Sequence, residues 1–310
     1  MARPEPVSMT RRAAAGGLLA LAAGNAAAQR QPQRLYFLGA SSVMSAALDG
    51  SDLKTLVSGP RGGVNDGIGF DPASRRLFWT NMGRASADDG FIQSARLDGS
   101  DLRTVVRPGG TFTPKQLKVA GGSLYWSDRE GMRVMRANLD GSGVEVLVQT
   151  GAGDQDRKDP SRWCVGLAVD LVRRHVYWTQ KGGDNAGQGS IRRAGLDLPA
   201  GATPASRRDI EVLFANLPEP IDLDLDPAAR RLYWTDRGDN TVSSSPLDAP
   251  ARTILVRGLR EAIGIALDRT GRRMFYTSLG GEVGTAATDG SDARLLLSGQ
   301  GMLTGVVVAP

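Results

Sequence analysis

Eleven residues of this chain have side chains suited to holding a ligand or a metal ion, and they fall into two groups. Eight lie at or just ahead of short apolar runs: Asn65, Asp66, Lys115, Gln116, Arg162, Trp163, Glu219 and Glu261. Three lie in one glycine-rich stretch: Lys181, Asp184 and Asn185. Carboxylate and amide oxygens are hard ligands for divalent cations, whereas amides, both charges and an indole together are typical of a site for a small polar ligand or a peptide.

The side chains most used in nucleophilic and zinc sites occur only once each. Cys164 is the single cysteine and His175 the single histidine, which excludes an intramolecular disulfide, a histidine-based triad and a histidine-rich metal site. Cys164 lies at the start of an apolar run, where we expect a buried, unreactive thiol. No Gly-x-Gly-x-x-Gly segment follows a strand and opens a helix, so we predict no nucleotide cofactor, and no other cofactor is indicated.

The elements that must position the eleven residues come from a unit repeated six times. Its clearest copy spans residues 221–242, where an alternating apolar run, an Asp-Pro turn and Tyr-Trp-Thr-Asp precede a third run that begins near Thr241. Related tetrapeptides begin at residues 36, 78, 125, 177, 233 and 275. Period-two alternation interrupted by turn residues predicts strands, and repeats of 42 to 56 residues are typical of four-stranded propeller blades.

Each repeat divides into four predicted strands. Inner strands are expected at 67–71, 116–120, 166–170, 221–226 and 264–268, second strands end in the aromatic tetrapeptide, and third strands end in turns of the Leu-Asp-Gly type. A sixth inner strand is absent before Tyr36 and occurs instead at 304–309. We therefore predict an all-β, six-bladed β-propeller of antiparallel blades, closed by backbone hydrogen bonds between residues 304–309 and 34–39.

The tetrapeptide Tyr-Trp-Thr-Asp, the Leu-Asp-Gly turn and the Gly-Ile-Ala-Leu-Asp strand resemble the class B repeats of the low-density lipoprotein receptor, the YWTD β-propeller family. The likeness covers residues 29–310, which we expect to form a single domain. It implies aromatic strands that pack between blades and a final aspartate that supports hydrogen bonds between blades. Asp128 and Asp236 match that aspartate, whereas Gly39, Asn81, Gln180 and Ser278 replace it, so we expect uneven stability around the ring.

In such a propeller the loops from fourth to first strands and from second to third strands gather on one face, which we call the top face. Two of these loops in the fourth repeat, residues 150–162 and 180–189, are long and glycine-rich, and binding residues are often carried by such loops on a rigid scaffold. The residues ahead of the inner strands converge on the channel mouth at the same face. We therefore expect the eleven residues to border one ligand-binding surface.

The first 28 residues differ from the rest of the chain. Thr10, Arg11 and Arg12 precede a weakly apolar run that ends in three alanines, which predicts a twin-arginine export signal cleaved near Ala28. The run is too short and too rich in glycine to be a stable membrane span. This indicates a bacterial-type exported member of the family, periplasmic or secreted, with no membrane span in the mature chain. Removing residues 1–28, which hold three arginines and one glutamate, lowers the formal net charge from +5 to +3, too little to indicate a nucleic-acid partner.

These patterns favour an exported, non-catalytic binding module, expected to be a monomer, that recognises a protein, a glycan or a small polar ligand on the top face. The alternative is a divalent-metal-dependent hydrolase of the lactonase or esterase type with its site at the channel mouth. Lys115 and Arg162 oppose that alternative because they would place two cations beside the metal. Its oxygen ligands would be Asn65, Asp66, Gln116, Glu219 and Glu261.

Overall fold

The computed structural model describes residues 1–4, 32–59, 63–84, 86–268, 270 and 272–310. Residues Gln33–Pro310 form one compact unit. The predicted export signal, residues 1–28, lies outside the described residues except for positions 1–4. None of the helices in the described part of the chain is long and apolar enough to cross a bilayer.

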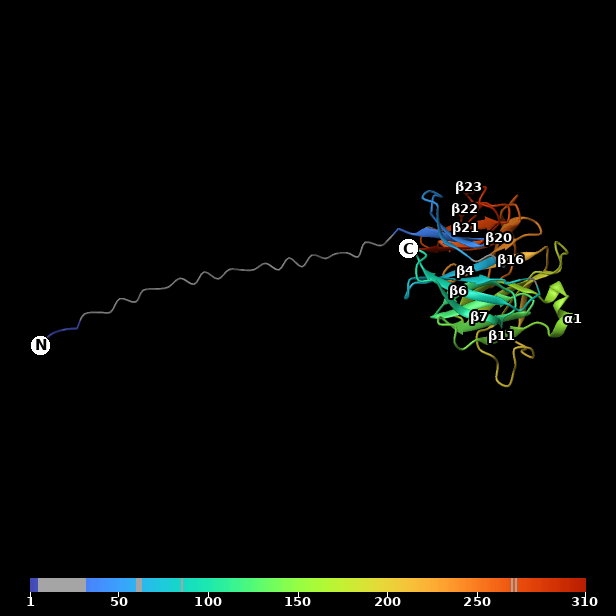
Figure 1. The fold of residues 1–310 in the computed structure, drawn as a ribbon, viewed down its shortest axis with the longest axis horizontal. Coiled ribbons are helices and arrows are strands. Elements are labelled where there is room, and N and C mark those ends of the chain that lie inside the picture. Colours follow the sequence, from blue (N-terminus) through green and yellow to red (C-terminus); the bar gives the residue numbers. More distant parts are fainter. Residues whose placement is uncertain (5–31, 60–62, 85, 269, 271) are drawn as a thin grey trace. The chain divides into compact units, whose positions relative to one another are not determined.

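The described strands of this unit form six four-stranded antiparallel sheets, which confirms the predicted six-bladed β-propeller (Figure 1). We number the blades one to six. From inner to outer strand, blade one is β24 (Leu303–Ala309), β1 (Arg34–Gly39), β2 (Ser42–Ala47) and β3 (Lys54–Ser58); blade two is β4 (Asn65–Asp71), β5 (Arg76–Asn81), β6 (Gly90–Arg96) and β7 (Arg103–Thr111); blade three is β8 (Pro114–Ala120), β9 (Ser123–Asp128), β10 (Arg133–Asn138) and β11 (Glu145–Gln149). Blade four is β12 (Cys164–Asp170), β13 (His175–Gln180), β14 (Gly189–Gly195) and β15 (Glu211–Leu217); blade five is β16 (Pro220–Asp226), β17 (Arg231–Asp236), β18 (Thr241–Pro246) and β19 (Thr253–Val256); blade six is β20 (Ala262–Asp268), β21 (Arg273–Ser278), β22 (Val283–Ala287) and β23 (Arg294–Leu297).

The ring closes where the two ends of the propeller chain meet. Strand β24 pairs antiparallel with β1, and the register runs from Arg34 opposite Ala309 to Gly39 opposite Leu303. Blade one therefore takes its inner strand from the carboxyl end and its other strands from the amino end, as predicted. Pairing of this kind leaves no unpaired inner edge between the first and last blades.

The aromatic tetrapeptides form the hydrophobic core between the blades. The first aromatic residue of one blade packs with the second aromatic residue of the next, as Tyr125 does with Trp178 and Tyr177 with Trp234. The same pairing joins Tyr36 to Trp79, Phe78 to Trp126, Tyr233 to Tyr276 and Phe275 to Phe37. Because each buried aromatic side chain removes a large apolar area from water, these six clusters hold neighbouring blades together.

The third residue of the tetrapeptide links the blades by hydrogen bonds. The hydroxyl of Thr80 accepts the N–H of Gly67 in its own blade at 2.8 Å and donates to the carbonyl of Lys115 in the next blade at 2.7 Å. Thr179, Thr235 and Thr277 repeat both bonds, and Ser127 donates to Gly166. Blade one has Leu38 at this position, and there Thr304 of β24 donates to the carbonyl of Asn65 at 2.9 Å instead.

The final aspartate of the tetrapeptide fixes the loop that arrives from the preceding blade. Asp128 accepts the N–H groups of Phe112 at 3.0 Å and Thr113 at 2.7 Å, and Asp236 accepts that of Glu219 at 2.9 Å. The replacements bond differently: the Asn81 amide donates to the Asn65 side chain, and the Gln180 amide to the carbonyl of Ser161. The difference in stability between blades remains a prediction.

The loop of residues 150–162 contains regular structure that the sequence did not predict. It holds the short helix α1 (Gly153–Arg157) and the 3₁₀ turn η1 (Pro160–Arg162). Asp159 caps the 3₁₀ turn by accepting the N–H of Ser161, and Pro160 supplies a φ suited to its first position. These two turns set the position of Trp163, the residue that enters blade four.

Candidate functional site

A cavity of about 430 Å³ lies where the inner strands begin, and we call it the mouth cavity. We number the seven residues of each inner strand from one to seven. The second residues of all six inner strands line the cavity: Asp66, Lys115, Val165, Ile221, Ile263 and Thr304. In the pairing of each of the six inner strands with its second strand, a register shift lies between residues one and four of the inner strand. Such a bulge re-aims side chains, and here it accompanies the placement of the second residues toward the channel.

Around this ring, the residues that directly follow the tetrapeptides form the rim. Met82, Arg129, Lys181, Arg237 and Leu279 all line the mouth cavity. The backbone N–H of each one bonds to a carbonyl just ahead of the inner strand, for example Lys181 to Trp163 at 3.2 Å and Arg237 to Glu219 at 3.0 Å. The repeat therefore dictates which residues reach the cavity, although their side chains differ from blade to blade.

One side of the cavity carries a buried ion pair between blades two and three. The ammonium of Lys115 binds the carboxylate of Asp66, whose other oxygen accepts the amide of Gln116 at 2.9 Å. Lys115 Nζ also lies 3.2 Å from the sulfur of Met82. Burial lowers the pKa of Lys115, and the charge of Asp66 opposes this effect. The charges of Lys115 and Asp66 therefore neutralise each other within the wall of the mouth cavity.

A larger network of charges lies on the side formed by blades four and five. Lys181 binds Glu219 and Asp184, each at 2.7 Å, and is itself nearly buried. Arg237 binds Glu219 at 3.2 Å and Glu261 at 2.7 Å. Glu219 is 2% exposed, so its charge is satisfied by two cations rather than by water. A buried carboxylate with this many partners fixes the shape of the wall.

Trp163 lies half-buried between these two groups of charges. The Arg129 guanidinium carbon is 5.1 Å from the centre of its ring, and Lys181 Nζ is 5.8 Å from it. Its indole N–H donates to the carbonyl of Arg157 at 2.9 Å. Contacts of both cations with the indole and the bond to α1 hold the aromatic side chain in one orientation. Trp163 is thus a fixed aromatic anchor in the wall of the mouth cavity.

The remaining part of the mouth cavity is apolar. Val165, Ile221 and Ile263 form a small hydrophobic cluster of their own, and Leu279 packs against it. All four residues also line the cavity. The cavity therefore combines an aliphatic floor, a fixed indole and a rim of paired charges, which is the composition of a site for protein side chains more than for a free metal ion.

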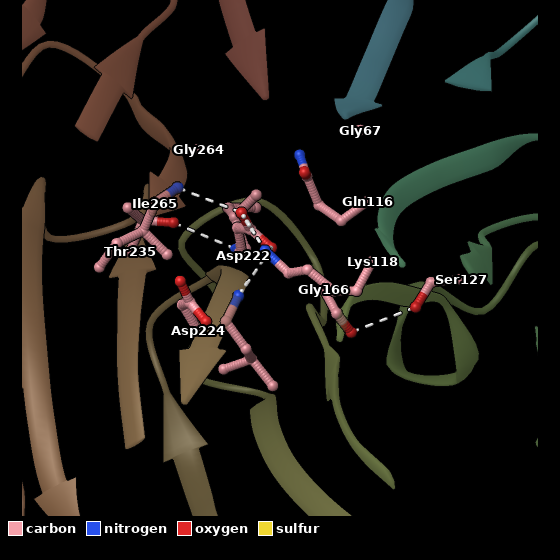
Figure 2. Close-up of polar contacts among 12 residues, drawn as sticks. Gly67, Gln116, Lys118, Ser127, Gly166, Asp222, Asp224, Thr235, Gly264 and Ile265 are labelled. Carbon is pink, nitrogen blue, oxygen red and sulfur yellow. Dashed lines mark hydrogen bonds and ion pairs between the residues drawn. The ribbon is translucent and has the colours of Figure 1, made fainter. Parts of the chain in front are cut away.

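The third residues of the inner strands follow those that line the mouth cavity. Four of these are glycines, and the other two are Gln116 and Asp222. Lys118 of blade three reaches across blade four to the Asp222 carboxylate of blade five, with 3.2 Å from Nζ to either oxygen (Figure 2). Burial raises the pKa of Asp222 to about 6, against the effect of the Lys118 charge. Neither Lys118 nor Asp222 lines the mouth cavity.

The structure brings six of the eleven predicted residues to the mouth cavity, namely Asp66, Lys115, Trp163, Lys181, Asp184 and Glu219. The other five lie beside it. Asn65 is buried and bonded to Asn81, Gln116 lies beneath Asp66, and Arg162 bonds to the carbonyl of Thr150. The backbone N–H of Asn185 donates to Glu219, and exposed Glu261 binds Arg237.

Sequence reasoning missed Arg129 and Arg237, which both follow a tetrapeptide that ends in aspartate. The signal that could have found them is the position itself, because Lys181 occupies the same place and was selected only for its glycine-rich loop.

The carboxylates that a metal-dependent hydrolase would need are bonded to cations. Asp66 binds Lys115, Glu219 binds Lys181 and Arg237, and Glu261 binds Arg237. Within the part of the chain that the structure describes, no group of three or more His, Cys, Asp or Glu residues is arranged to hold a metal ion. Cys164 is buried, and burial raises the pKa of its thiol to about 12.

Comparison with known proteins gives relatives but no matching family model. Low-density lipoprotein receptor-related protein 1 of Pyricularia oryzae is 47% identical over 210 residues, 66% of this chain and 66% of that protein. The 3-hydroxyacyl-CoA dehydrogenase-like protein LAM1 of Cochliobolus heterostrophus is 39% identical over 178 residues, 56% of this chain and 38% of that protein. A chain in the crystal structure of a nidogen/laminin complex has a TM-score of 0.73 at 22% identity, covering 90% of this chain and 98% of that one.

The sheets and the nidogen/laminin likeness together define the class of the protein as a six-bladed β-propeller. The receptor-related relative and the six aromatic tetrapeptides support its assignment to the YWTD β-propeller family.

Proposed function

We propose that the protein is an exported, non-catalytic interaction module that holds a segment of a protein partner in the mouth cavity. The observation that carries the proposal is the composition of this cavity, where the fixed indole of Trp163 stands beside the floor of Val165, Ile221 and Ile263. Hot spots of protein interfaces typically consist of apolar and aromatic anchors in a pre-formed pocket with a polar rim.

A protein ligand suits this site better than a glycan or a small polar molecule. The floor is aliphatic, and the charged groups of the rim are already bonded to one another. Most of the binding free energy of a partner would therefore come from burying its apolar side chains against the floor. The similar chain in the nidogen/laminin complex belongs to a protein assembly, which agrees with this choice of partner.

Selection of peptides from a random library against the purified protein tests the proposal. We expect peptides with one or two apolar side chains, and their Kd should rise about tenfold or more in Trp163→Ala, the usual effect of removing a central anchor. Leu295→Ala is the matched control, because Leu295 lies on the outer strand β23 and is 57% exposed. Peptides that bind Trp163→Ala and the control equally well would contradict the location of the site.

Calcium titration separates this function from the hydrolase alternative. We expect no tight binding by calorimetry, because Lys115, Lys181 and Arg237 occupy the carboxylates that calcium would use. Tight binding that is lost in Glu219→Ala would favour the hydrolase instead and would justify a screen of lactones and esters.

The proposal that the protein is exported rests on residues 1–28, and a separate experiment tests it. Fusing residues 1–40 to a reporter in a bacterial host with the twin-arginine pathway should deliver the reporter outside the cytoplasm, and replacing both Arg11 and Arg12 by lysine should retain it inside. Equal export of both fusions would contradict the twin-arginine route.

A further inference from the structure

A second cavity, separate from the mouth cavity, lies between blades five and six. It has a volume of about 580 Å³, and we call it the side groove. Asp226, the last residue of β16, and Leu267, the sixth residue of β20, both line it. The side groove therefore lies at the opposite ends of the inner strands from the mouth cavity. No described residue lines both cavities.

One arginine of the side groove lacks the partner that its equivalents have in other blades. Arg231 is the first residue of the second strand β17. In blades one, two and six the arginine at this position binds an aspartate two residues ahead of the outer strand, and the pairs, at 2.7 to 2.8 Å, are Arg34 with Asp52, Arg76 with Asp101 and Arg273 with Asp292. In blade five Ala251 stands in place of that aspartate. Arg231 donates to the hydroxyl of Ser244 at 2.8 Å but forms no ion pair with any described carboxylate.

A second arginine of the groove is also without an ion pair. Arg272 directly precedes the second strand β21. In blades four and five the arginine at this position binds both oxygens of the aspartate after the third strand, and the pairs are Arg174 with Asp197 and Arg230 with Asp248. In blade six this aspartate is Asp289, whose Oδ1 accepts the N–H of Ser291 at 2.9 Å and its hydroxyl at 2.6 Å. The bonds from Ser291 lower the pKa of Asp289, and the more distant charge of Arg272 lowers it less. Arg272 thus lies near Asp289 without forming an ion pair with it or with another described carboxylate.

The groove also contains carboxylate oxygens that can accept further hydrogen bonds. Asp226 Oδ1 accepts the N–H of Ala229 at 3.0 Å, and a carboxylate has room for about four such bonds. The described charged residues that line the groove are two of each sign, namely Arg231, Arg272, Asp226 and Asp289. An anion would face two carboxylates there, and a cation would face two guanidinium groups. A neutral ligand rich in hydroxyl groups meets neither repulsion, because each hydroxyl can accept from a guanidinium and donate to a carboxylate.

We propose that the side groove binds a neutral oligosaccharide. Neighbouring hydroxyls of a sugar ring would accept from the forked N–H groups of the two arginines and donate to the two carboxylates. The C–H face of the ring would lie against Leu255 and Leu267, which also line the groove. Ala229 and Arg272 at its edge are exposed, so the groove is open to solvent, and its volume is in the range that holds ligands larger than one hexose. This inference goes beyond the proposed function at the mouth cavity and does not depend on it.

Calorimetry on the purified protein tests the ligand class with four neutral trisaccharides: cellotriose, maltotriose, mannotriose and triacetylchitotriose. We expect at least one of them to bind saturably, with Kd on the order of 1 mM or lower. Trigalacturonate, which carries carboxylates, and deacetylated chitotriose, which carries ammonium groups, should bind about tenfold more weakly or worse. Stronger binding of either charged trisaccharide or of inorganic phosphate would overturn the proposal. Saturable heat from none of the four neutral trisaccharides at about 10 mM would overturn it as well.

Variants with matched controls locate the site. Ala229→Phe fills the groove and should abolish binding of the trisaccharide, whereas Ala228→Phe should leave it unchanged, because Ala228 is equally exposed and does not line the groove. Arg272→Gln should weaken binding about tenfold or more, while Arg174→Gln, at the same position in blade four, should have no effect. All four side chains are exposed, so the variants should fold.

Two outcomes would refute the location of this site. The first is equal binding by Ala229→Phe and Ala228→Phe. The second is loss of binding in Trp163→Ala with retention in Ala229→Phe, which would place the saccharide in the mouth cavity.

Discussion

The hydroxyl of Thr179 in blade four donates a hydrogen bond to the carbonyl of Ile221 in blade five at 2.8 Å. It also accepts the N–H of Gly166 in its own blade at 2.7 Å. One buried oxygen atom thus satisfies two backbone groups, the Gly166 N–H within the bulge of β12 and the Ile221 carbonyl within the bulge of β16. The same relationship in other blades makes the hydroxyl, rather than the final aspartate of the tetrapeptide, the regular hydrogen-bonded link around the ring.

Replacing this hydroxyl by a methyl group tests its importance. Thr179→Val keeps the shape of the side chain and leaves a buried donor and a buried acceptor without a partner, which should lower the free energy of unfolding by about 2 to 4 kcal/mol. Urea denaturation measures the change. Thr253→Val is the matched control, since Thr253 is exposed on the outer strand β19, and a loss no greater than in the control would refute the role of Thr179.

Gly166 lies so close to blade five that any side chain would collide with it. A Cβ atom at this position would stand 1.9 Å from the carbonyl oxygen of Ile221, and backbone cannot move away cheaply. Gly166→Ala should therefore cost more than about 3 kcal/mol, beyond the usual range of single substitutions.

The control for this prediction is Gly183→Ala. The nearest heavy atom to a Cβ at Gly183 is Ala186 Cβ at 3.3 Å, and the site lies in a loop of the top face. Thermal melts of the two variants should differ widely. Similar melting temperatures would show that blades four and five can move apart at Gly166 without loss of stability, which would contradict this prediction.

Asp236 is expected to reduce stability at neutral pH even though it belongs to the tetrapeptide. One of its oxygens is buried and has no hydrogen-bond partner among the described residues. Burial, reinforced by the charge of nearby Asp239, raises the pKa of the Asp236 carboxyl to about 6. The pKa of Asp236 in the folded protein is higher than the usual 3.8. The ionised carboxylate therefore lowers the free energy of unfolding, fully so above pH 6, and this loss is relieved as the pH falls from 6 toward 4.

Asp236→Asn should remove that cost. We expect roughly 1 to 3 kcal/mol more stability at pH 7 and a flatter dependence of the unfolding free energy between pH 4 and 6. Asp128→Asn serves as the comparison, because both Asp128 oxygens accept backbone N–H groups and one also binds Arg133, so this change should destabilise. Denaturant titrations at pH 4, 5, 6 and 7 would show the opposite signs, and a loss of stability in both variants would contradict this reading of Asp236.

The sequence was sufficient to predict the fold because each blade repeats the same local pattern. Alternating apolar residues placed the strands, and the missing strand before Tyr36 placed the closure at residues 304–309. These are local signals that act within about 50 residues, and six copies reinforce one another. Inner strands begin one or two residues earlier than the repeat suggested, because β-bulges lie at their entry.

The candidate site was predicted less completely, for two physical reasons. The bulge at the start of each inner strand decides which residue faces the channel, so Asp66 lines the cavity while its neighbour Asn65 is buried against Asn81. Ion pairs across the ring join residues far apart in sequence, as Lys118 and Asp222 do. No periodicity in the sequence indicates such a pair, which depends on the closed ring.

The closure of the ring gives the last prediction. Strand β24 supplies the whole inner strand of blade one and also the Thr304 hydroxyl that bonds to the carbonyl of Asn65 in blade two. Deleting residues 302–310 removes both, together with the buried side chains of Leu303 and Val306, so the melting temperature should fall by far more than on removal of Pro310 alone. Thr304→Val provides a milder test in a chain that retains β24, with an expected loss of about 1 to 2 kcal/mol. An unchanged melting temperature after the deletion would mean that five complete blades hold the ring without the sixth inner strand, and closure by β24 would then contribute nothing to stability.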